Sequence, residues 1–226
     1  KKKKEKIIII PRGVDPKRFN PKNIDSKRLF FLTNHWQLPD GTPIVLFPSR
    51  IAPFKGHKTL LKAISLLKKE SEIKFICLMT GLPKKNSNYI SEINSIIEDN
   101  GLSEYVKFTG PCADMPAAYK ISDIVVSPAD KPEGFGRIII ESQSMERPVI
   151  ASAHGGSLEL IKNNFNGILF KPKNEQDLAD KLKYLIYLSR EKKEKIIKNA
   201  SVLVGEKYNI DKMYDSNFKL YNSLIK

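Results

Sequence analysis

From residue 43 onward, short apolar runs alternate with longer stretches in which apolar residues recur at helical spacing. The run 43–50 (PIVLFPSR) predicts a buried strand, whereas 56–69 places Leu and Ile on one helical face and Lys on another. The same criteria predict further strands at 73–79, 106–109, 123–127, 148–152 and 167–170. Helices are predicted at 88–100, 114–120, 136–145, 158–162, 174–188, about 190–204 and 210–225.

The predicted strands are continuously apolar and do not alternate strictly with polar residues. Strands of that kind, separated by helices, indicate a parallel sheet that is covered on both faces. We therefore expect an α/β fold in which residues 43–226 form a Rossmann-like, doubly wound domain. Ligands bind at the carboxyl ends of the strands in such sheets. The loops after residues 50, 81, 109, 127 and 152 are therefore the places to search for a site.

The first 42 residues differ from the rest of the chain. Residues 11–42 are rich in Pro, Asn and charge and show no clear periodicity, which favours a linker or a long surface connection. The chain begins with Lys, and the four Ile of KKKKEKIIII are too few for the apolar core of a signal peptide. We expect 1–42 to be a lead-in segment and the chain to be a piece of a longer protein.

The charge balance suggests an anionic partner without identifying it. The formal net charge is +14, and Lys contributes most of the surplus. Nucleic-acid readers favour Arg for bidentate contacts, and the chain has no RNA-type aromatic platform, so we expect no nucleic-acid partner. An anionic membrane surface fits the surplus, as does a compositional bias at exposed positions.

The residue types that hold metals or form disulfides are sparse. Cys77 and Cys112 are the only cysteines, which supports neither a disulfide framework nor a cysteine-rich metal site. The three histidines have no second ligand at metal spacing, so no metal is expected: His35, His57 and His154. The chain also lacks a G-x-G-x-x-G fingerprint, a P-loop and a G-x-S-x-G elbow.

The segment PADKPEGFGRIIIESQ follows the fourth predicted strand and carries the most chemistry. Gly134 and Gly136 bracket Phe135 where a helix should begin, and exposed N–H groups with the helix dipole form an anion site there. Glu133 and Glu141 would lie roughly 12 Å apart if all eight intervening steps were helical. That distance is about the span from a sugar to a ribose across a diphosphate. It exceeds the separation of about 5–9.5 Å between the two catalytic carboxyl groups of a glycoside hydrolase. Alternatively, Glu141 is a buried capping or salt-bridge residue.

Two further loops reach the same edge of the predicted sheet. Arg50 and Lys55 follow the first strand, beside Gly56, and could converge on a phosphate near the helix start. The alternative is ordinary surface charge. The pair Gly155-Gly156 follows the fifth strand and is either a third element of the site or a simple tight turn.

Together these motifs resemble a known family. Arg50-x4-Lys55-Gly56, Glu133-Gly134-Phe135-Gly136 with the seven-residue gap to Glu141, and His154-Gly155-Gly156-x-x-Glu159 resemble the C-terminal domain of glycosyltransferase family 4. These enzymes are retaining and have the GT-B fold. The phrase IIIIPRGVDPKRFNP is similar to the segment that leads into this domain. The run EGFGRIIIESQSMERPVIASAHGG is similar to a bacterial subgroup that acts on lipopolysaccharide or other surface glycans.

The resemblance implies a role for each candidate residue. Glu133 would contact the transferred sugar as the catalytic residue, and Glu141 would hold the ribose hydroxyls. Arg50 and Lys55 would bind the diphosphate of a UDP- or GDP-sugar, helped by backbone amides in the Gly134–Gly136 turn. No cofactor or metal is implied.

The chain departs from the family pattern in two ways. Glu146 stands where the family often has Gly, and this difference is expected to affect the packing of that turn but not the site. The second, N-terminal domain, which binds the acceptor, is missing, so the chain is expected to be half an enzyme. It would work in the cytoplasm, peripheral to the inner face of the cell membrane. A phosphorylase or hydrolase on the same fold, or a basic non-catalytic module for nucleic acid or membrane, remain alternatives.

Overall fold

The computed structural model describes residues 7–70, 73–82 and 88–225. Its sheet contains six parallel strands in the order β3-β2-β1-β4-β5-β6. The strands are β1 (Ile44–Pro48), β2 (Ile76–Thr80), β3 (Val106–Gly110), β4 (Ile124–Ser127), β5 (Val149–Ser152) and β6 (Ile168–Phe170). All six predicted strands are therefore present, with ends that shift by up to three residues.

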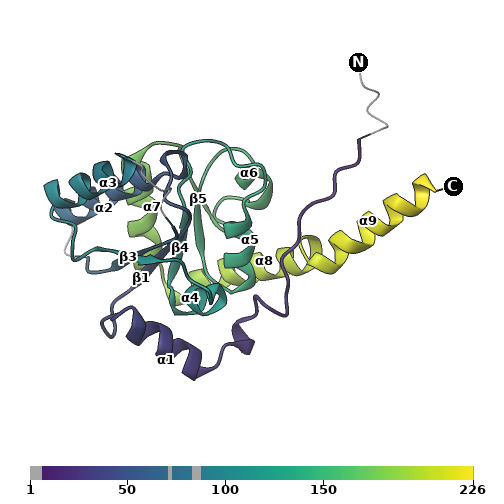
Figure 1. The fold of residues 1–226 in the computed structure, drawn as a ribbon, viewed down its shortest axis with the longest axis horizontal. Helices are drawn as coiled ribbons and strands as arrows, with labels where there is room; N and C mark the ends of the chain where they lie inside the picture. The colour runs from purple at the N-terminus through teal and green to yellow at the C-terminus, as the bar shows by residue number, and fades with distance from the viewer. Residues whose placement is uncertain (1–6, 71–72, 83–87, 226) are drawn as a thin grey trace, which may run out of the picture.

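The described part of the chain contains nine α-helices, most of which connect or cover these strands (Figure 1). They are α1 (Ser26–His35), α2 (His57–Glu70), α3 (Asn88–Asp99), α4 (Met115–Ile121), α5 (Arg137–Ser144), α6 (Ser157–Leu160), α7 (Glu175–Tyr187), α8 (Arg190–Lys207) and α9 (Ile210–Leu224). Short 3-10 turns occur at Pro21–Asn23 and Pro53–Lys55. The eight helices predicted from 56 onward are confirmed, and α1 is an addition.

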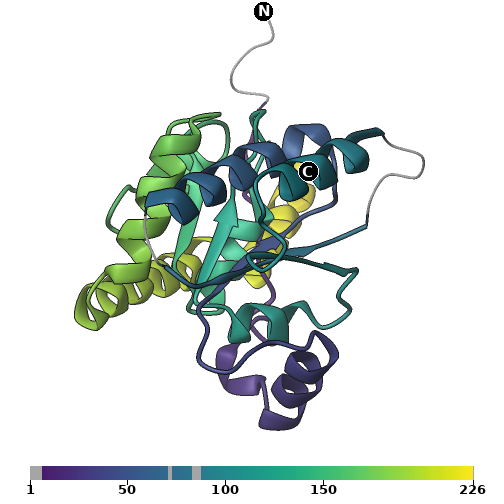
Figure 2. The ribbon, with the colours of Figure 1, turned by 90° about the vertical axis from the view of Figure 1, so that its left-hand side faces the viewer.

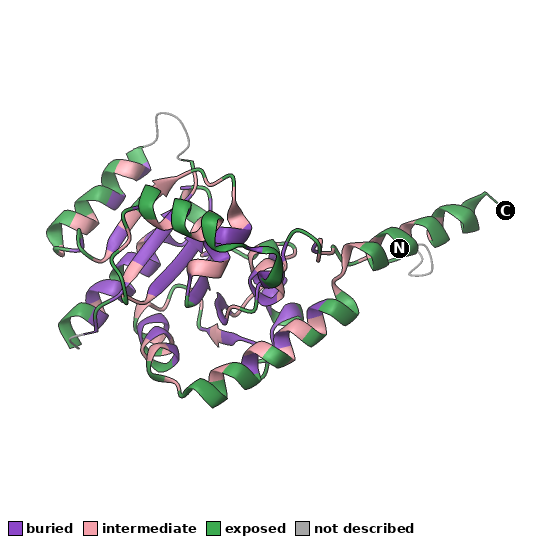
Figure 3. Cartoon of the chain, turned by 90° about the horizontal axis from the view of Figure 1, so that it is seen from below, coloured by how far each residue is buried: buried purple, intermediate pink, exposed green. Residues whose placement is uncertain are grey.

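Apart from the edge strand β3, the strands are largely buried on both faces because each face has its own layer of helices. Val45 and Phe47 of β1 pack into a core with α2, α3 and α7. Ile44 and Leu46, their neighbours along the strand, pack on the other side against α4, α5 and α6. Figure 3 shows the strands as the buried centre between these two layers. The Rossmann-like, doubly wound prediction is thereby confirmed.

The lead-in segment contains more structure than its pattern predicts. The expectation of an aperiodic linker at 11–42 is wrong for α1, which begins after its N-cap Asp25 and buries Leu32. Two phenylalanines of this helix, Phe30 and Phe31, are exposed, so its apolar residues do not all lie on one face. Figure 2 shows α1 packed below α4, and the Arg28 guanidinium donates to Asp114 at the start of α4 from Nε (2.8 Å) and Nη2 (2.6 Å).

The lead-in segment is hydrogen-bonded to the turn between α8 and α9. The Val14 N–H donates to the Tyr208 carbonyl (2.7 Å), and the Ile210 N–H donates to the Val14 carbonyl (3.0 Å). Gly13 is needed beside this contact, because a Cβ there would lie 2.4 Å from the Ile210 nitrogen. Residues 13–14 therefore pass closely over the turn between α8 and α9 (Figure 1).

The departure at Glu146 has a visible conformational consequence. Glu146 follows Met145, the C-cap of α5, and has a φ of +56°, in the left-handed region that glycine adopts most easily. The Arg147 N–H donates to the Ser142 carbonyl (2.9 Å) around this residue, which closes the helix end. The Glu146 side chain is exposed, so the turn keeps its shape with a non-glycine residue at its left-handed position.

Candidate functional site

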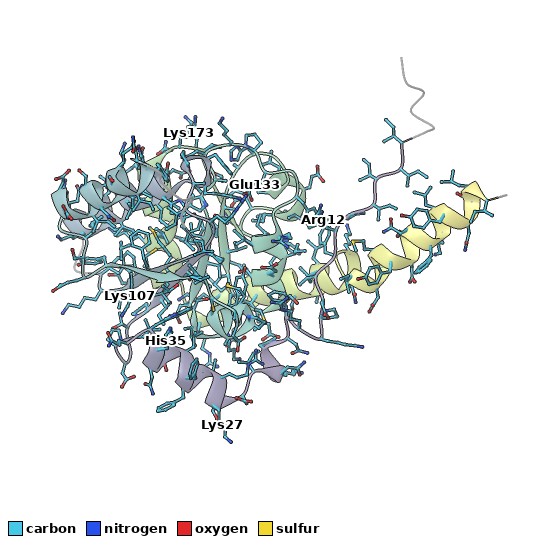
Figure 4. All side chains as sticks on the ribbon, in the orientation of Figure 1. Arg12, Lys27, His35, Lys107, Glu133 and Lys173 are labelled. Carbon is cyan, nitrogen blue, oxygen red and sulfur yellow. The ribbon has the colours of Figure 1, made fainter. Side chains whose placement is uncertain are left out.

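The carboxyl ends of β1, β4 and β5 are neighbours in the sheet, so the loops that follow them meet at one edge. These loops carry Lys55, Glu133 and the pair Gly155-Gly156. Figure 4 shows Glu133 at this edge, whereas Lys27 and His35 of α1 lie at the opposite end of the molecule. The loops predicted to form a site are therefore brought together.

Gly56 allows the loop after β1 to approach the loop after β4. Its φ is +87°, and a Cβ at this position would lie only 1.7 Å from the Pro128 carbonyl oxygen. Two hydrogen bonds secure the approach: the Asp130 N–H donates to the Phe54 carbonyl (2.9 Å), and the Thr59 hydroxyl donates to Asp130 Oδ1 (2.8 Å). The turn that carries Lys55 is thereby fixed beside the loop that carries Glu133.

Lys55 and Glu133 form an ion pair between Lys55 Nζ and Glu133 Oε1. Their side chains are 19% and 24% exposed, so the pair is partly screened from water and remains accessible. The ammonium group fixes one carboxylate oxygen, and the carboxylate balances part of the charge of the cation. Two residues that the sequence singles out separately thus form one unit.

Gly155 and Gly156 let the loop after β5 pack directly on the backbone of residues 133–135. The Gly156 N–H donates to the Glu133 carbonyl (2.9 Å). A Cβ on Gly155 would lie 2.6 Å from that carbonyl oxygen, and one on Gly156 would lie 2.4 Å from the Phe135 carbonyl oxygen. These glycines therefore do more than form a tight turn: they support the backbone of the Glu133 loop.

The predicted helix start is confirmed, but the helix begins later than the distance estimate assumed. Gly136 is the N-cap of α5 with φ of +93°, so Glu133 lies outside the helix. The estimate of roughly 12 Å between Glu133 and Glu141 required a continuous helix, and its premise is wrong. Gly134 is exposed, and Phe135 packs edge-on against Tyr208 with ring centroids 5.9 Å apart.

A narrow pocket opens between these loops. It is lined by Ser127, Ala129, Glu133, Gly136, Ile139, Ser152, His154 and Ser157. Neither the three serines nor His154 is among the site residues predicted from the sequence. His154 Nε2 lies 2.8 Å from the Ala129 carbonyl oxygen, which fixes the ring across the pocket. The position of His154 directly before Gly155-Gly156 was the available signal.

Glu141 lies within α5 and is largely buried. The Tyr119 hydroxyl of α4 donates to Glu141 Oε2 (2.9 Å). Burial raises the pKa of Glu141 above its ordinary value, while the Tyr119 hydrogen bond and the nearby Arg137 and Arg18 oppose that rise. The partner of Glu141 is thus a neutral hydroxyl, which no spacing in the sequence indicated.

Arg50 is placed less closely than Lys55. It lies two residues beyond β1, and its side chain is exposed. Its backbone is close to the loop after β2, since a Cβ on Gly81 would lie 3.1 Å from the Arg50 Cα. Arg50 therefore borders the same edge of the sheet with its cationic group open to solvent.

Within the described residues, no group of three His, Cys, Asp or Glu side chains is arranged to hold a metal ion. Among the helices that the structure describes, none combines the length and the apolar character needed to cross a bilayer.

Comparison with solved structures identifies glycosyltransferases. A glycosyltransferase from Rickettsia africae ESF-5 is 33% identical with a TM-score of 0.94, over 99% of this chain and 59% of that protein. Anabaena HepE, solved in complex with UDP and glucose, is 26% identical with a TM-score of 0.88, over 98% of this chain and 58% of that protein. The fold is therefore that of GT-B glycosyltransferases.

Sequence comparison agrees. A GDP-mannose-dependent phosphatidylinositol monomannoside mannosyltransferase of Mycobacterium tuberculosis is 27% identical over 185 residues, which are 78% of this chain and 46% of that protein. The chain thus spans about half the length of the curated relatives it matches. The family described as "Glycosyl transferases group 1" matches residues 31–202, a range that includes Arg50, Lys55, Glu133, Glu141 and the pair Gly155-Gly156. The chain belongs to this family of glycosyl transferases.

Proposed function

We propose that this chain is the donor-binding half of a retaining glycosyltransferase of family 4. The observation that carries the proposal is the Lys55–Glu133 ion pair at the carboxyl end of the sheet, in which Glu133 also lines the pocket. A cation that binds phosphate and a carboxylate that contacts a sugar are the two groups needed at the reacting end of a nucleotide sugar. Both come from loops that glycines fix in place.

The diphosphate is the leaving group in the proposed reaction, and its charge grows as the sugar departs. Lys55 and Arg50 supply positive charge, and the amides of Phe135 and Gly136, directly before α5, add hydrogen-bond donors beside the positive end of the helix dipole. Glu133 contacts the transferred sugar, and Glu141 accepts hydrogen bonds from the ribose hydroxyls. The scheme contains no step that requires a divalent metal.

The relatives support a nucleotide-sugar donor and leave the base open. HepE was solved with UDP and with UDP-glucose, whereas the mycobacterial relative is GDP-mannose-dependent. We therefore propose a UDP- or GDP-sugar as the donor of this chain. Both share the ribose and the diphosphate that the candidate residues would contact.

We propose that the acceptor is bound by an N-terminal domain of the same polypeptide. The chain spans about half of its relatives, which leaves room in them for such a domain. A surface glycan or lipopolysaccharide precursor as acceptor rests on the resemblance of EGFGRIIIESQSMERPVIASAHGG. Peripheral attachment to the inner face of the membrane, through the Lys surplus, is part of this proposal.

The substitution Glu133→Gln tests the proposed division of roles. In the complete polypeptide, sugar transfer should fall by about 100-fold or more, because the carboxylate beside the reacting sugar is lost. Binding of UDP or GDP should not weaken, because Glu133 does not bind the nucleotide and its loss as a carboxylate leaves the Lys55 ammonium group free for the diphosphate. The matched control is Glu98→Gln, an exposed residue near the end of α3, which should leave both values unchanged.

The same experiment contains the outcomes that would reject the proposal. Unchanged transfer in Glu133→Gln removes the role of Glu133. Release of free sugar without an acceptor indicates a hydrolase. Salt-sensitive binding to nucleic acid or anionic vesicles, with no preference for a nucleotide sugar, indicates the non-catalytic alternative.

A further inference from the structure

Tyr119 is the largest residue that is completely buried in the described structure, and its hydroxyl has one specific partner. The hydroxyl donates to Glu141 Oε2 at 2.9 Å, from α4 to α5. A carboxylate can accept at both oxygens. A donor on Oε2 therefore fixes the rotation of the group and leaves Oε1 to face another donor.

The Tyr119 ring is held by the lead-in segment. Phe19 packs edge-on against it, with ring centroids 6.0 Å apart. The Phe19 carbonyl accepts a hydrogen bond from the Ser144 hydroxyl of α5 (2.7 Å). Phe19 therefore connects both helices that carry the Tyr119–Glu141 pair, and little freedom remains for the phenol.

The charged groups around the pair favour an ionised Glu141. Burial raises the pKa of Glu141 above its ordinary value, and the Tyr119 hydroxyl, Arg137 from α5 and Arg18 from the lead-in segment each act against that rise. Burial and the Glu141 charge raise the pKa of Tyr119, so the phenol keeps its proton and remains a donor. The donor and acceptor roles in this hydrogen bond are thus fixed.

We propose that Tyr119 is a positioning residue for Glu141, which it orients so that the free carboxylate oxygen accepts from the ribose hydroxyls of the donor nucleotide. The inference rests on the proposed function, because it requires Glu141 to face a ribose. It goes further by assigning the discrimination between ribose and deoxyribose to a buried contact between α4 and α5. Tyr119 itself would not touch the nucleotide.

The test compares binding of a nucleoside diphosphate with that of its 2′-deoxy counterpart. The unmodified chain should prefer the ribose form by at least about tenfold, the size expected for a hydrogen bond to a charged group. In Tyr119→Phe the preference should fall to about threefold or less, with an unchanged affinity for the deoxy form. The control Tyr105→Phe, in which the ring packs on Phe75 away from the site, should keep the full preference.

A pH series separates positioning from a general structural effect. The preference for ribose should disappear as Glu141 becomes protonated at falling pH. In Tyr119→Phe the midpoint should move to higher pH, because the hydrogen bond that stabilises the carboxylate is gone. Phe19→Leu provides a second variant that leaves the hydroxyl in place but loosens the ring, and it should reduce the preference partially.

The outcomes distinguish this inference from the proposed function. If the unmodified chain binds neither nucleotide, both are wrong. If it binds both but does not prefer ribose, the Glu141 contact and with it the inference are wrong, while diphosphate binding stands. If the preference and its midpoint are the same in Tyr119→Phe, only the role of Tyr119 is refuted.

Discussion

Individual backbone positions determine how closely the site's loops approach one another. Gly56, Gly155 and Gly156 each face a carbonyl oxygen at a distance that admits no Cβ. The motifs around Lys55 and Glu133 could be selected from the sequence because they follow strands. The contact of Tyr119 with Glu141 could not, because it joins residues 22 positions apart through the packing of two helices.

Glu146 gives a test of backbone strain away from the site. Its φ of +56° costs roughly 1–2 kcal/mol for a residue with a Cβ. Glu146→Gly should therefore raise the free energy of unfolding, by up to about 1 kcal/mol after the entropy of glycine is included. The control Lys195→Gly, within α8, should lower it by about the same amount. Urea unfolding measures both, and a loss of stability in Glu146→Gly would contradict the account.

His57 gives a test by pH. The ring is fully buried against Phe47, and burial lowers its pKa to about 4 from 6.5. The unfolded chain therefore binds more protons below pH 6.5, so that stability is lost as the pH falls towards the folded pKa. The loss attributable to His57 is about 2 kcal/mol between about pH 7 and pH 5. In His57→Gln the free energy of unfolding, measured with urea, should fall less steeply as the pH is lowered. An equal slope in the variant and the unmodified chain would contradict the assignment of this loss to buried His57.

At the scale of secondary-structure elements, α1 shows where sequence patterns stop being informative. Apart from the edge strand β3, the strands are mainly apolar because both of their faces are covered, and this made them predictable. In α1 only Leu32 is buried, while Phe30 and Phe31 face solvent. Its attachment combines the packing of Leu32 with the contact between Arg28 and Asp114 across the fold, and the local sequence indicates neither.

A double-mutant cycle on Arg28 and Asp114 tests the attachment of α1. Each side chain is about one-third exposed, so the coupling should be about 1 kcal/mol or less. Asp114→Ala should cost more than Arg28→Ala, because Asp114 also caps α4 by accepting from the Ala117 N–H (3.1 Å). Lys27→Ala on the exposed side of α1 is the control. Equal costs for the two single variants would show that the cap contributes nothing.

For the molecule as a whole, the C-terminal helix α9 is much less buried than the domain from which it extends. No residue of α9 is buried, and its exposed apolar side chains include Tyr214, Phe218 and Tyr221. Figure 1 shows α9 extending from the body on the same side as the beginning of the described chain. The net charge of +14 is spread over many surface lysines, of which the proposed site uses one, Lys55, together with Arg50.

The central claim is that this domain binds the diphosphate of a nucleotide sugar through Arg50 and Lys55, and calorimetric titration with UDP and GDP tests it most directly. At least one nucleotide should bind with measurable heat, and Arg50→Ala combined with Lys55→Ala should weaken binding by at least about tenfold. Lys195→Ala with Lys198→Ala removes the same charge from exposed positions on α8 and should leave the affinity unchanged. Absence of heat with both nucleotides, or equal affinity in the Arg50/Lys55 variant, would contradict the claim.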